Sequence, residues 1–455
     1  MNIYVKIEIL ARELEGRLLL ALAAAERGHR VLLGDLTALL SHRLWLPPGV
    51  FHDKSLTPSA SKMAFHARLR DRGFLVTSQD EEHGLLDEFG TWADFAARRF
   101  SHDSLAQAER CFMWGPHDHD TLTALHPGQT DRIVLTGSPR VDLWRPELAD
   151  FYANRALPGI DPSRPFLLLA HQGAIVMDHN PFWQRIADQR PRYFRGDDDD
   201  RERGWYRRCA GEVRYLEHLV PAIRAIARAN PETQVVIRPH PLDAEGSWRA
   251  LVGDLPNLVI TREGMASAWV RRAHLVIHNG STVGFEAAAA GVPLVSFRPV
   301  NDRDGYVSNR LGRSATTRDE LLDLVRKAVR GERPDGGWHV PGGVLTERLG
   351  QLSGSLAADR IVDEWEAISP PVQGAPAFNA SRAVRIANAH RAIGRARVAL
   401  REGPRKHGFV TGHKFRSLPV DEVQTIVDDL RRALGRFHTV RIRRHGSRLI
   451  EVTSS

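Results

Sequence analysis

The sequence has only two cysteines, Cys111 and Cys209, which lie far apart without His or Cys neighbours at metal-ligand spacing. A disulfide framework and a zinc site are therefore disfavoured, and a reducing cytoplasm fits. The longest apolar run, residues 18–25, is far too short to cross a bilayer. The first ten residues include Lys6 and Glu8 and predict a strand rather than a signal peptide. We therefore expect a cytoplasmic protein.

Several sequence motifs of well-known sites are also missing. The chain contains no Gly-x-Gly-x-x-Gly, no Walker motif, no Gly-x-Ser-x-Gly and no Cys-x-x-Cys. The net charge of +8 suits an anionic partner, which could be a nucleotide sugar, an anionic lipid surface or nucleic acid. An Arg-rich proteome background would give the same charge. Nucleic acid is disfavoured because the sequence has neither a recognition-helix motif nor an aromatic–basic stacking platform.

Short apolar, β-branched runs alternate with amphipathic segments of helix length. This alternation predicts an α/β fold with two Rossmann-like, doubly wound parallel sheets. The predicted strands are residues 3–9, 30–34, 50–53, 73–78, 110–114, 132–136, 166–170, 234–238, 257–261, 274–278 and 294–297. The predicted helices are residues 13–27, 206–230, 266–272, 283–290, 318–330 and 355–368. Ligands bind beyond the carboxyl ends of such strands, so two domains facing each other would form a central cleft.

Turn-rich and Pro-rich stretches divide the 455 residues into four segments. We expect an acceptor-side domain at residues 1–155, a nucleotide-donor domain at 156–368, a linker at 369–376 and a small α+β extension at 377–455. Residues 331–343 carry five glycines and two prolines and predict a loop. The extension is rich in arginine and is expected to close with a strand at residues 438–452.

The strongest candidate site is the segment 278–287, where a predicted strand ends and a helix begins. Gly280 permits close backbone approach, and Ser281 or Thr282 can cap the helix, whose N-terminal N–H groups attract a phosphate. Glu286 lies on the same helix face as Thr282 and could accept hydrogen bonds from ribose hydroxyls. An ordinary capped helix of an α/β sheet is the alternative interpretation.

A second candidate follows the strand at 234–238, where Arg238-Pro239-His240-Pro241 holds two polar side chains on a stiff backbone. A guanidinium pairs with phosphate, and an imidazole can donate to a phosphate oxygen or polarise a leaving group. A stiff turn with a solvated Arg238 would look the same. After the strand at 166–170, His171-Gln172-Gly173 is either a phosphate contact through Gly173 or a plain turn.

In the first domain, Asp80-Glu81-Glu82 follows the strand at 73–78. Glycosyl transfer needs a base or a stabilising carboxylate, and we expect either Glu81 or Glu82 to supply it. An acidic helix start is the alternative. Further candidates at the first strand–helix turn are Glu8, Arg12 and Glu13.

Two acidic runs could be mistaken for metal ligands. The run of four aspartates at residues 197–200 reads as a solvated charge cluster. His117-Asp118-His119-Asp120 reads as a helix start. We therefore expect no metal and no cofactor apart from the nucleotide-sugar substrate.

The order of motifs along the chain resembles the bacterial surface carbohydrate biosynthesis proteins, a family of GT-B-fold-like transferases for capsule or O-antigen glycans. The matching segments are residues 11–20, 25–31, 53–55, 79–82, 114–115, 136–140, 238–241, 281–293 and 413–419. The tetrapeptide 238–241 is also similar to that of transferases using cytidine nucleotides, whereas Glu286-Ala287 resembles the ribose-binding segment of other GT-B enzymes. Family members often have Asn-Thr-Asn where this chain has residues 171–173.

The resemblance and the motifs together predict a metal-independent glycosyltransferase that uses a CMP- or other NDP-linked sugar. Arg238, His240, Ser281 and Thr282 would hold phosphate, with Gly280 and Gly173 allowing close approach, and Glu286 would hold the ribose. The expected acceptor is a glycan or lipid-linked glycan, and the Arg-rich tail could contact the inner membrane. A nucleotide-sugar epimerase is the rival enzyme. A nucleic-acid-binding protein and a non-catalytic scaffold are rivals of other classes.

Overall fold

The computed structural model describes residues 1–35, 38–39, 46–81, 96, 98–171, 176–177, 184, 199–240, 243–300, 306–340, 342–350, 352–369, 385, 389, 392–393, 418 and 420–454. These residues divide into two compact units, each of which contains one β-sheet. The first unit comprises Met1–Gly84, Glu88–Phe151 and Thr346–Ser455, and the second contains Tyr152–Leu345. The predicted α/β class, with two Rossmann-like sheets of the GT-B type, is confirmed.

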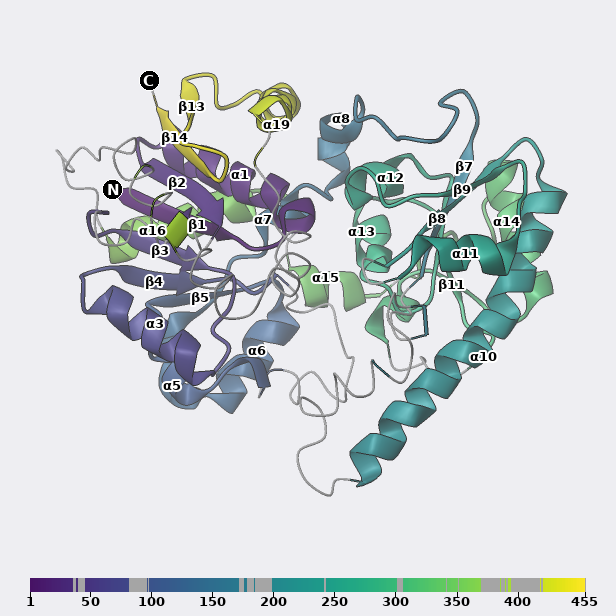
Figure 1. Cartoon of the computed structure of the whole chain (residues 1–455), viewed down its shortest axis with the longest axis horizontal. Helices are drawn as coiled ribbons and strands as arrows, with labels where there is room; N and C mark the ends of the chain where they lie inside the picture. The colour runs from purple at the N-terminus through teal and green to yellow at the C-terminus, as the bar shows by residue number, and fades with distance from the viewer. Residues whose placement is uncertain are drawn as a thin grey trace. The chain divides into compact units, whose positions relative to one another are not determined.

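The sheet of the first unit has eight strands in the order β13-β14-β2-β1-β3-β4-β5-β6 (Figure 1). Six of them are parallel to one another: β1 (Asn2–Ile7), β2 (Arg30–Asp35), β3 (Val50–Asp53), β4 (Leu75–Ser78), β5 (Arg110–Met113) and β6 (Ile133–Leu135). Their carboxyl ends therefore lie along one edge. Helices between them include α3 (Ala60–Arg70), α5 (His102–Leu105) and α6 (Pro116–Leu125), and α7 (Pro139–Asp142) follows β6.

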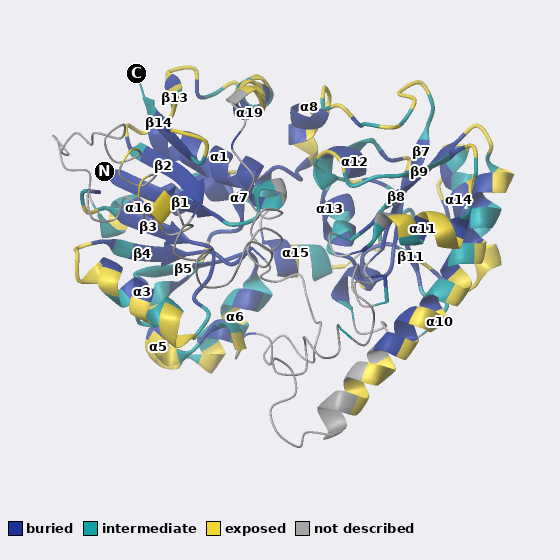
Figure 2. Ribbon diagram, viewed as in Figure 1, coloured by how far each residue is buried: buried dark blue, intermediate teal, exposed yellow. Residues whose placement is uncertain are grey.

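Helix α1 (Leu10–Glu26) follows β1 and is buried over nearly its whole length (Figure 2). Its run of leucine and alanine lets it pack on every side, against the sheet and against α7 and α16. A Cβ on Gly16 would lie 2.9 Å from the backbone nitrogen of Arg140 in α7. The absence of a side chain at this position therefore allows the two helices to approach closely.

Helix α16 (Ala357–Ile368) belongs to the first unit, which corrects the expected end of the second domain at residue 368. Trp365 is fully buried, and its indole Nε1 donates at 3.0 Å to Oγ1 of Thr77, a residue of β4. The N-terminus of α16 is fixed by Asp142, whose carboxylate accepts from the N–H groups of Ala357 and Ala358. The chain therefore returns to its first sheet after completing the second.

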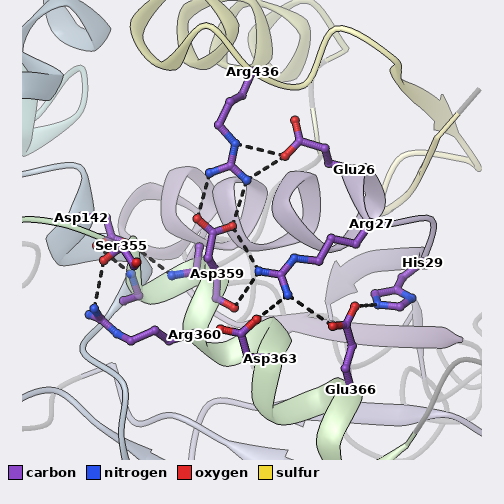
Figure 3. Close-up of polar contacts among 12 residues, drawn as sticks. Glu26, Arg27, His29, Asp142, Ser355, Asp359, Arg360, Asp363, Glu366 and Arg436 are labelled. Carbon is purple, nitrogen blue, oxygen red and sulfur yellow. Dashed lines mark hydrogen bonds and ion pairs between the residues drawn. The ribbon is translucent and has the colours of Figure 1, made fainter.

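The expected closing strand at residues 438–452 is instead a hairpin of β13 (Val440–Arg444) and β14 (Leu449–Ser454). Strand β14 pairs antiparallel with β2, so the extension enlarges the first sheet. Preceding the hairpin is α19 (Val420–Leu434), which packs on α1. Arg436 then bridges Glu26 of α1, at 2.7 Å, and Asp359 of α16, at 2.8 Å (Figure 3).

The second unit has a six-stranded sheet in the order β12-β11-β10-β7-β8-β9, with all neighbours parallel. Its strands are β7 (Phe166–Ala170), β8 (Gln234–Arg238), β9 (Leu258–Ile260), β10 (Leu275–His278), β11 (Leu294–Phe297) and β12 (Arg313–Ala315). The connecting helices are α10 (Asp199–Ala229), α11 (Glu245–Val252), α12 (Ala266–Arg272) and α13 (Val283–Ala289), and α14 (Arg318–Val329) follows β12. Apolar residues of these strands, of α10 and of α14 form one core.

Candidate functional site

Three neighbouring strands of the second unit, β10, β7 and β8, end at the same edge of the sheet. The segments that follow them contain most of the predicted nucleotide-binding residues. The turn after β7 includes Gln172 and Gly173, which lie outside the described residues. The turn after β10 is described, and after β8 the described residues are Pro239, His240 and Asp243.

Arg238, the last residue of β8, points at backbone carbonyl groups. Its guanidinium donates to the carbonyl oxygens of residues 262–264 at 2.7 to 3.2 Å and lies over the ring of Trp269. Burial lowers the pKa of Arg238 to about 10, and the nearby carboxylate of Glu286 opposes that shift. Two of the predicted residues are therefore brought into electrostatic contact, although Arg238 anchors the loop after β9 rather than extending alone toward a phosphate.

His240 lies in a turn that Asp243 organises. The His240 backbone N–H donates to Asp243 Oδ2 at 3.0 Å, and the Trp248 indole donates to the same oxygen at 3.1 Å. Asp243 itself is fully buried, whereas His240 is half-buried at the start of the turn. Asp243 gave no recognisable motif in the sequence, yet it fixes the backbone that presents His240.

His171 turns inward instead of facing the sheet edge. Its ring stacks on Tyr215 at 5.8 Å between centroids and meets Trp248 edge-on at 5.0 Å. Its Nδ1 lies 3.8 Å from Asp243 Oδ2. His171 therefore packs in the core beneath the turn of His240.

A glycine and an asparagine determine the backbone conformation of the turn after β10. Gly280 has φ of +75°, a conformation that favours glycine, and an added Cβ would lie 2.9 Å from the ring of Tyr306. The Gly280 N–H donates to Asn309 Oδ1 at 2.8 Å, and Asn309 Nδ2 donates to Asn279 Oδ1 at 3.1 Å. Asn309 lies in the short 3-10 helix Val307–Arg310, whose sequence carries no signal that points to this turn.

Ser281 and Thr282 precede α13 as predicted, with different roles. Ser281 Oγ accepts from the backbone N–H of Val283 at 3.3 Å. Thr282 occupies the N-cap position, but its side chain makes no capping hydrogen bond, and it is half-buried. Glu286 lies in the first turn of α13 and is 2% exposed.

A buried histidine, His278, packs against the start of α13. The ring of His278 lies against Gly284, where a Cβ would approach its Cε1 to 2.7 Å. His278 Nε2 and Ser296 Oγ are 3.0 Å apart, and burial lowers the pKa of His278 to about 3. The imidazole is therefore neutral at physiological pH, and its role is to pack the base of the candidate site.

In the first unit, the predicted acidic residues follow β4. Asp80 is buried and paired with Arg99, whose Nε donates at 2.8 Å. Glu81 is also buried, and its Oε1 lies 2.8 Å from Arg17 Nη2 in α1. The other predicted carboxylate, Glu82, lies outside the described residues.

The two possible metal clusters give no metal site in the described part of the chain. Asp118 is fully buried in the first turn of α6, as expected for a helix start, and His119 pairs with Asp120. Residues 197–198 are not described, nor are the side chains of 199–200. Within the described ranges, no group of three His, Cys, Asp or Glu side chains could hold a metal ion. None of the described helices is both long and apolar enough to cross a membrane.

Several solved structures of other proteins superpose on this chain. A UDP-N-acetylglucosamine 2-epimerase superposes with a TM-score of 0.51 at 13% identity, covering 83% of this chain and 98% of its own. The enzyme of that name from Neisseria meningitidis, bound to UDP-GlcNAc, gives 0.46 at 11% identity and covers 81% and 100%. The wall teichoic acid polymerase TagF gives 0.38 at 10% identity and covers 70% and 71%.

No protein-family model and no curated protein sequence matches the chain. The first of these superpositions spans nearly all of the other protein, and it defines the class as a two-sheet α/β protein of the GT-B type. Since identity is so low, this likeness concerns the fold, and the activity has to be argued from the residues.

Proposed function

We propose that the chain is an enzyme acting on a nucleotide-activated sugar, with the nucleotide bound at the carboxyl edge of the second sheet. The observation that carries this proposal is the placement of Glu286. Its carboxylate lies in the first turn of α13, directly after β10, within electrostatic reach of Arg238 at the end of β8. A carboxylate in that position of a doubly wound sheet is suited to ribose hydroxyls.

Other residues of the same edge would complete the nucleotide site. Gly280 gives the turn its left-handed backbone conformation, and the half-buried Thr282 and His240 would contact phosphate. Arg238 supports the neighbouring loop and contributes its positive charge. Ser281 orders the start of α13.

Epimerisation of the sugar is the reaction we place first. The structure that superposes at a TM-score of 0.51 is named a UDP-N-acetylglucosamine 2-epimerase, and the match extends over 83% of this chain. Epimerisation needs a nucleotide sugar and groups that exchange a proton, but no acceptor. Glu81 or Glu82 would be a candidate for that proton transfer.

Glycosyl transfer is the second candidate, and one observation favours it. The order of sequence motifs resembles surface carbohydrate transferases from residue 11 to residue 419, which includes the extension. In that case a glycan or lipid-linked glycan would be the acceptor, and the same carboxylates would serve as base. Peripheral contact of the extension with an anionic membrane would belong to this alternative.

Nucleotide binding is tested by thermal unfolding with UDP, CMP, CDP, GDP and dTDP. A nucleotide at 100 times its Kd stabilises the native state by about 2.7 kcal/mol. For a unit of this size, that shifts Tm by roughly 5–10 °C. Glu286→Gln should weaken binding of the effective nucleotide by about 10- to 100-fold, because a charge-assisted hydrogen bond contributes about 1.5–3 kcal/mol. A wild-type protein that responds to none of the five nucleotides contradicts the proposal.

The two reactions are separated by incubation with UDP-N-acetylglucosamine alone, followed by proton NMR. An epimerase converts the sugar to its C2 epimer while the nucleotide sugar stays intact. A transferase leaves the donor unchanged until an acceptor is added, and then releases nucleotide. Binding of the nucleotide without either change would favour a non-catalytic scaffold.

A further inference from the structure

A buried histidine and a buried aspartate meet at the carboxyl edge of the second sheet. His171 follows β7 and Asp243 follows β8, and these two strands are parallel neighbours within the second unit. Both side chains are 0% exposed, and His171 Nδ1 lies 3.8 Å from Asp243 Oδ2. The two groups are therefore close enough for an ion pair, although the distance is too long for a hydrogen bond.

The polar atoms of this pair are only partly satisfied. Asp243 Oδ2 accepts from the backbone N–H of His240 and from the indole of Trp248, whereas Oδ1 has no hydrogen-bond partner among the described residues. Neither ring nitrogen of His171 has a hydrogen-bond partner there. Since buried polar atoms are nearly always hydrogen-bonded in folded proteins, a pair with three unsatisfied atoms must be stabilised in another way.

Charge balance provides that stabilisation. An ionised carboxylate that is fully buried needs a compensating charge, because it has lost its hydration. In the described part of the second unit, the basic side chain within ion-pair distance of Asp243 is His171. One proton bound by the pair makes it neutral, whichever of the two side chains carries it. The pair therefore needs one proton to be stable in this core.

Two aromatic residues hold the imidazole of His171 against Asp243. The ring is parallel to that of Tyr215 in α10, with an interplanar angle of 6°, and it meets Trp248 of α11 at 78°. An imidazolium is also attracted to the face of an aromatic ring, so the stack with Tyr215 favours the protonated form. Both contacts fix the distance between the imidazole and the carboxylate.

The carboxylate in turn holds the backbone of His240. Asp243 Oδ2 accepts from the His240 N–H at 3.0 Å, and the Asp243 N–H donates to the His240 carbonyl oxygen at 2.9 Å. The N–H of Ala244 donates to the carbonyl oxygen of Met177 at 2.7 Å, which ties the turn to the segment after β7. A displacement of the carboxylate would therefore move the backbone that carries the half-buried imidazole of His240.

We propose that His171 and Asp243 share one proton and that this neutral pair positions His240 at the nucleotide site. His171 is a positioning residue, because it acts on His240 through Asp243 and packs in the core. Without the imidazole, the carboxylate would remain as an unpaired buried charge, and the turn of His240 would open more often. That His240 meets a phosphate rests on the proposed function, whereas the link from His171 to the turn concerns the second unit alone.

The first test is a double-mutant cycle read by hydrogen exchange on the full chain, in peptides that contain His240 and Asp243. His171→Phe keeps a ring between Tyr215 and Trp248 but cannot carry a proton, and it should speed this exchange by about 10- to 100-fold. Asp243→Asn removes the charge while its amide oxygen can still accept from the His240 N–H. Adding Asp243→Asn to His171→Phe should therefore slow the exchange to within about two- to threefold of that of Asp243→Asn alone.

The second test measures the Kd of the nucleotide that raises the wild-type Tm, by isothermal titration calorimetry on the same variants. His171→Phe should weaken binding by about 10- to 100-fold, and the double variant should recover most of this loss. His274→Phe is the control, because His274 is exposed at the amino end of β10 in the same unit. It should leave both the exchange and the affinity as in the wild type.

The outcomes separate the pair from the proposed function. A double variant whose exchange is as fast as the two single effects combined predict would overturn the shared proton. Unchanged nucleotide affinity in His171→Phe would overturn its positioning role. A wild type that binds no nucleotide overturns the proposed function, while the exchange cycle still decides whether the pair holds the turn. Should His171→Phe not fold, the same cycle with His171→Asn decides, because its amide can donate to Asp243 without a charge.

Discussion

Replacing Asp53 by asparagine should destabilise the first unit strongly. Asp53 ends β3, and its carboxylate pairs with Lys6 Nζ at 2.8 Å and with Lys62 Nζ at 2.5 Å. The side chains of Asp53, Lys6 and Lys62 are 0%, 5% and 17% exposed. The substitution keeps the size of the side chain but removes its charge. Two ammonium groups would then remain close together without the carboxylate that pairs with both.

The magnitude follows from the cost of an unpaired buried charge. Removing one partner of a buried ion pair costs about 3–5 kcal/mol, because the remaining ion has lost its hydration and its partner. The asparagine carbonyl can still accept one hydrogen bond. The expected loss of stability is therefore that of one broken ion pair, and not the sum over all the contacts of Asp53. For a unit of this size, the expected fall in Tm is roughly 6–20 °C.

The effect should also depend on pH. The ammonium of Lys6, the His66 hydrogen bond and the ammonium of Lys62 hold the pKa of Asp53 well below its ordinary value of 3.8 despite burial. A carboxyl with a depressed folded-state pKa contributes stability above its unfolded value and loses it as the pH falls through the folded pKa. The difference between the wild type and Asp53→Asn should therefore narrow as the pH falls below the ordinary value of 3.8 toward the depressed pKa of the folded state.

Differential scanning calorimetry at pH 7, 5 and 3 measures both effects, and the effective nucleotide identifies the transition of the second unit by shifting it. Asp363→Asn is the control, because Asp363 is 62% exposed in its pair with Arg27 and an exposed pair contributes about 0–1 kcal/mol. A shift of the first unit's transition no larger than that of the control would refute the reasoning. So would a difference that stays constant down to pH 3.

Three further predictions concern the candidate site and the extension. Gly284→Ala should cost about 1–3 kcal/mol in urea unfolding, because the new methyl group meets the buried ring of His278, and an unchanged midpoint would show that the ring can move aside. Arg436→Ala should speed hydrogen exchange in β13 and β14 and leave the second sheet unchanged, since Arg436 bridges the extension to α1 and α16. Arg441 and Arg443 are exposed on β13, so reversing both to glutamate should reduce flotation with anionic vesicles, and equal flotation would exclude this strand as the contact.

Much of the fold could be predicted because the local patterns are strong. The strands at 50–53, 166–170, 234–238 and 294–297 have the predicted bounds, and each is a short apolar or β-branched run with a turn after it. Strand β12 was missed because the sequence Arg-Ser-Ala carries no apolar signature. The hairpin of β13 and β14 was predicted as one strand, although Gly446, with φ of +77°, marks the turn between them.

The candidate site was predictable in position but less so in the roles of its residues. Glu286 and Gly280 occupy the turn that the sequence indicated, because a strand end followed by a helix start is a local signal. The support of that turn by Asn309, 29 residues later, is not local, and the pattern around Asn309 is unremarkable. In the same way, the pairing of Arg17 with Glu81 depends on the adjacency of β1, β3 and β4 in the sheet.

Arg238 shows how a polar residue at a strand end can have partners within the chain that its local sequence does not indicate. Its position at the sheet edge follows from the strand before it and the proline after it, and both are visible in the sequence. Its partners are three carbonyl oxygens from the loop after β9, and their approach depends on how that loop folds. A guanidinium so engaged still gives the edge a positive charge, and this charge balances Glu286. Thr282 and His240, both half-buried at this edge, are the side chains where substitutions should separate binding from stability.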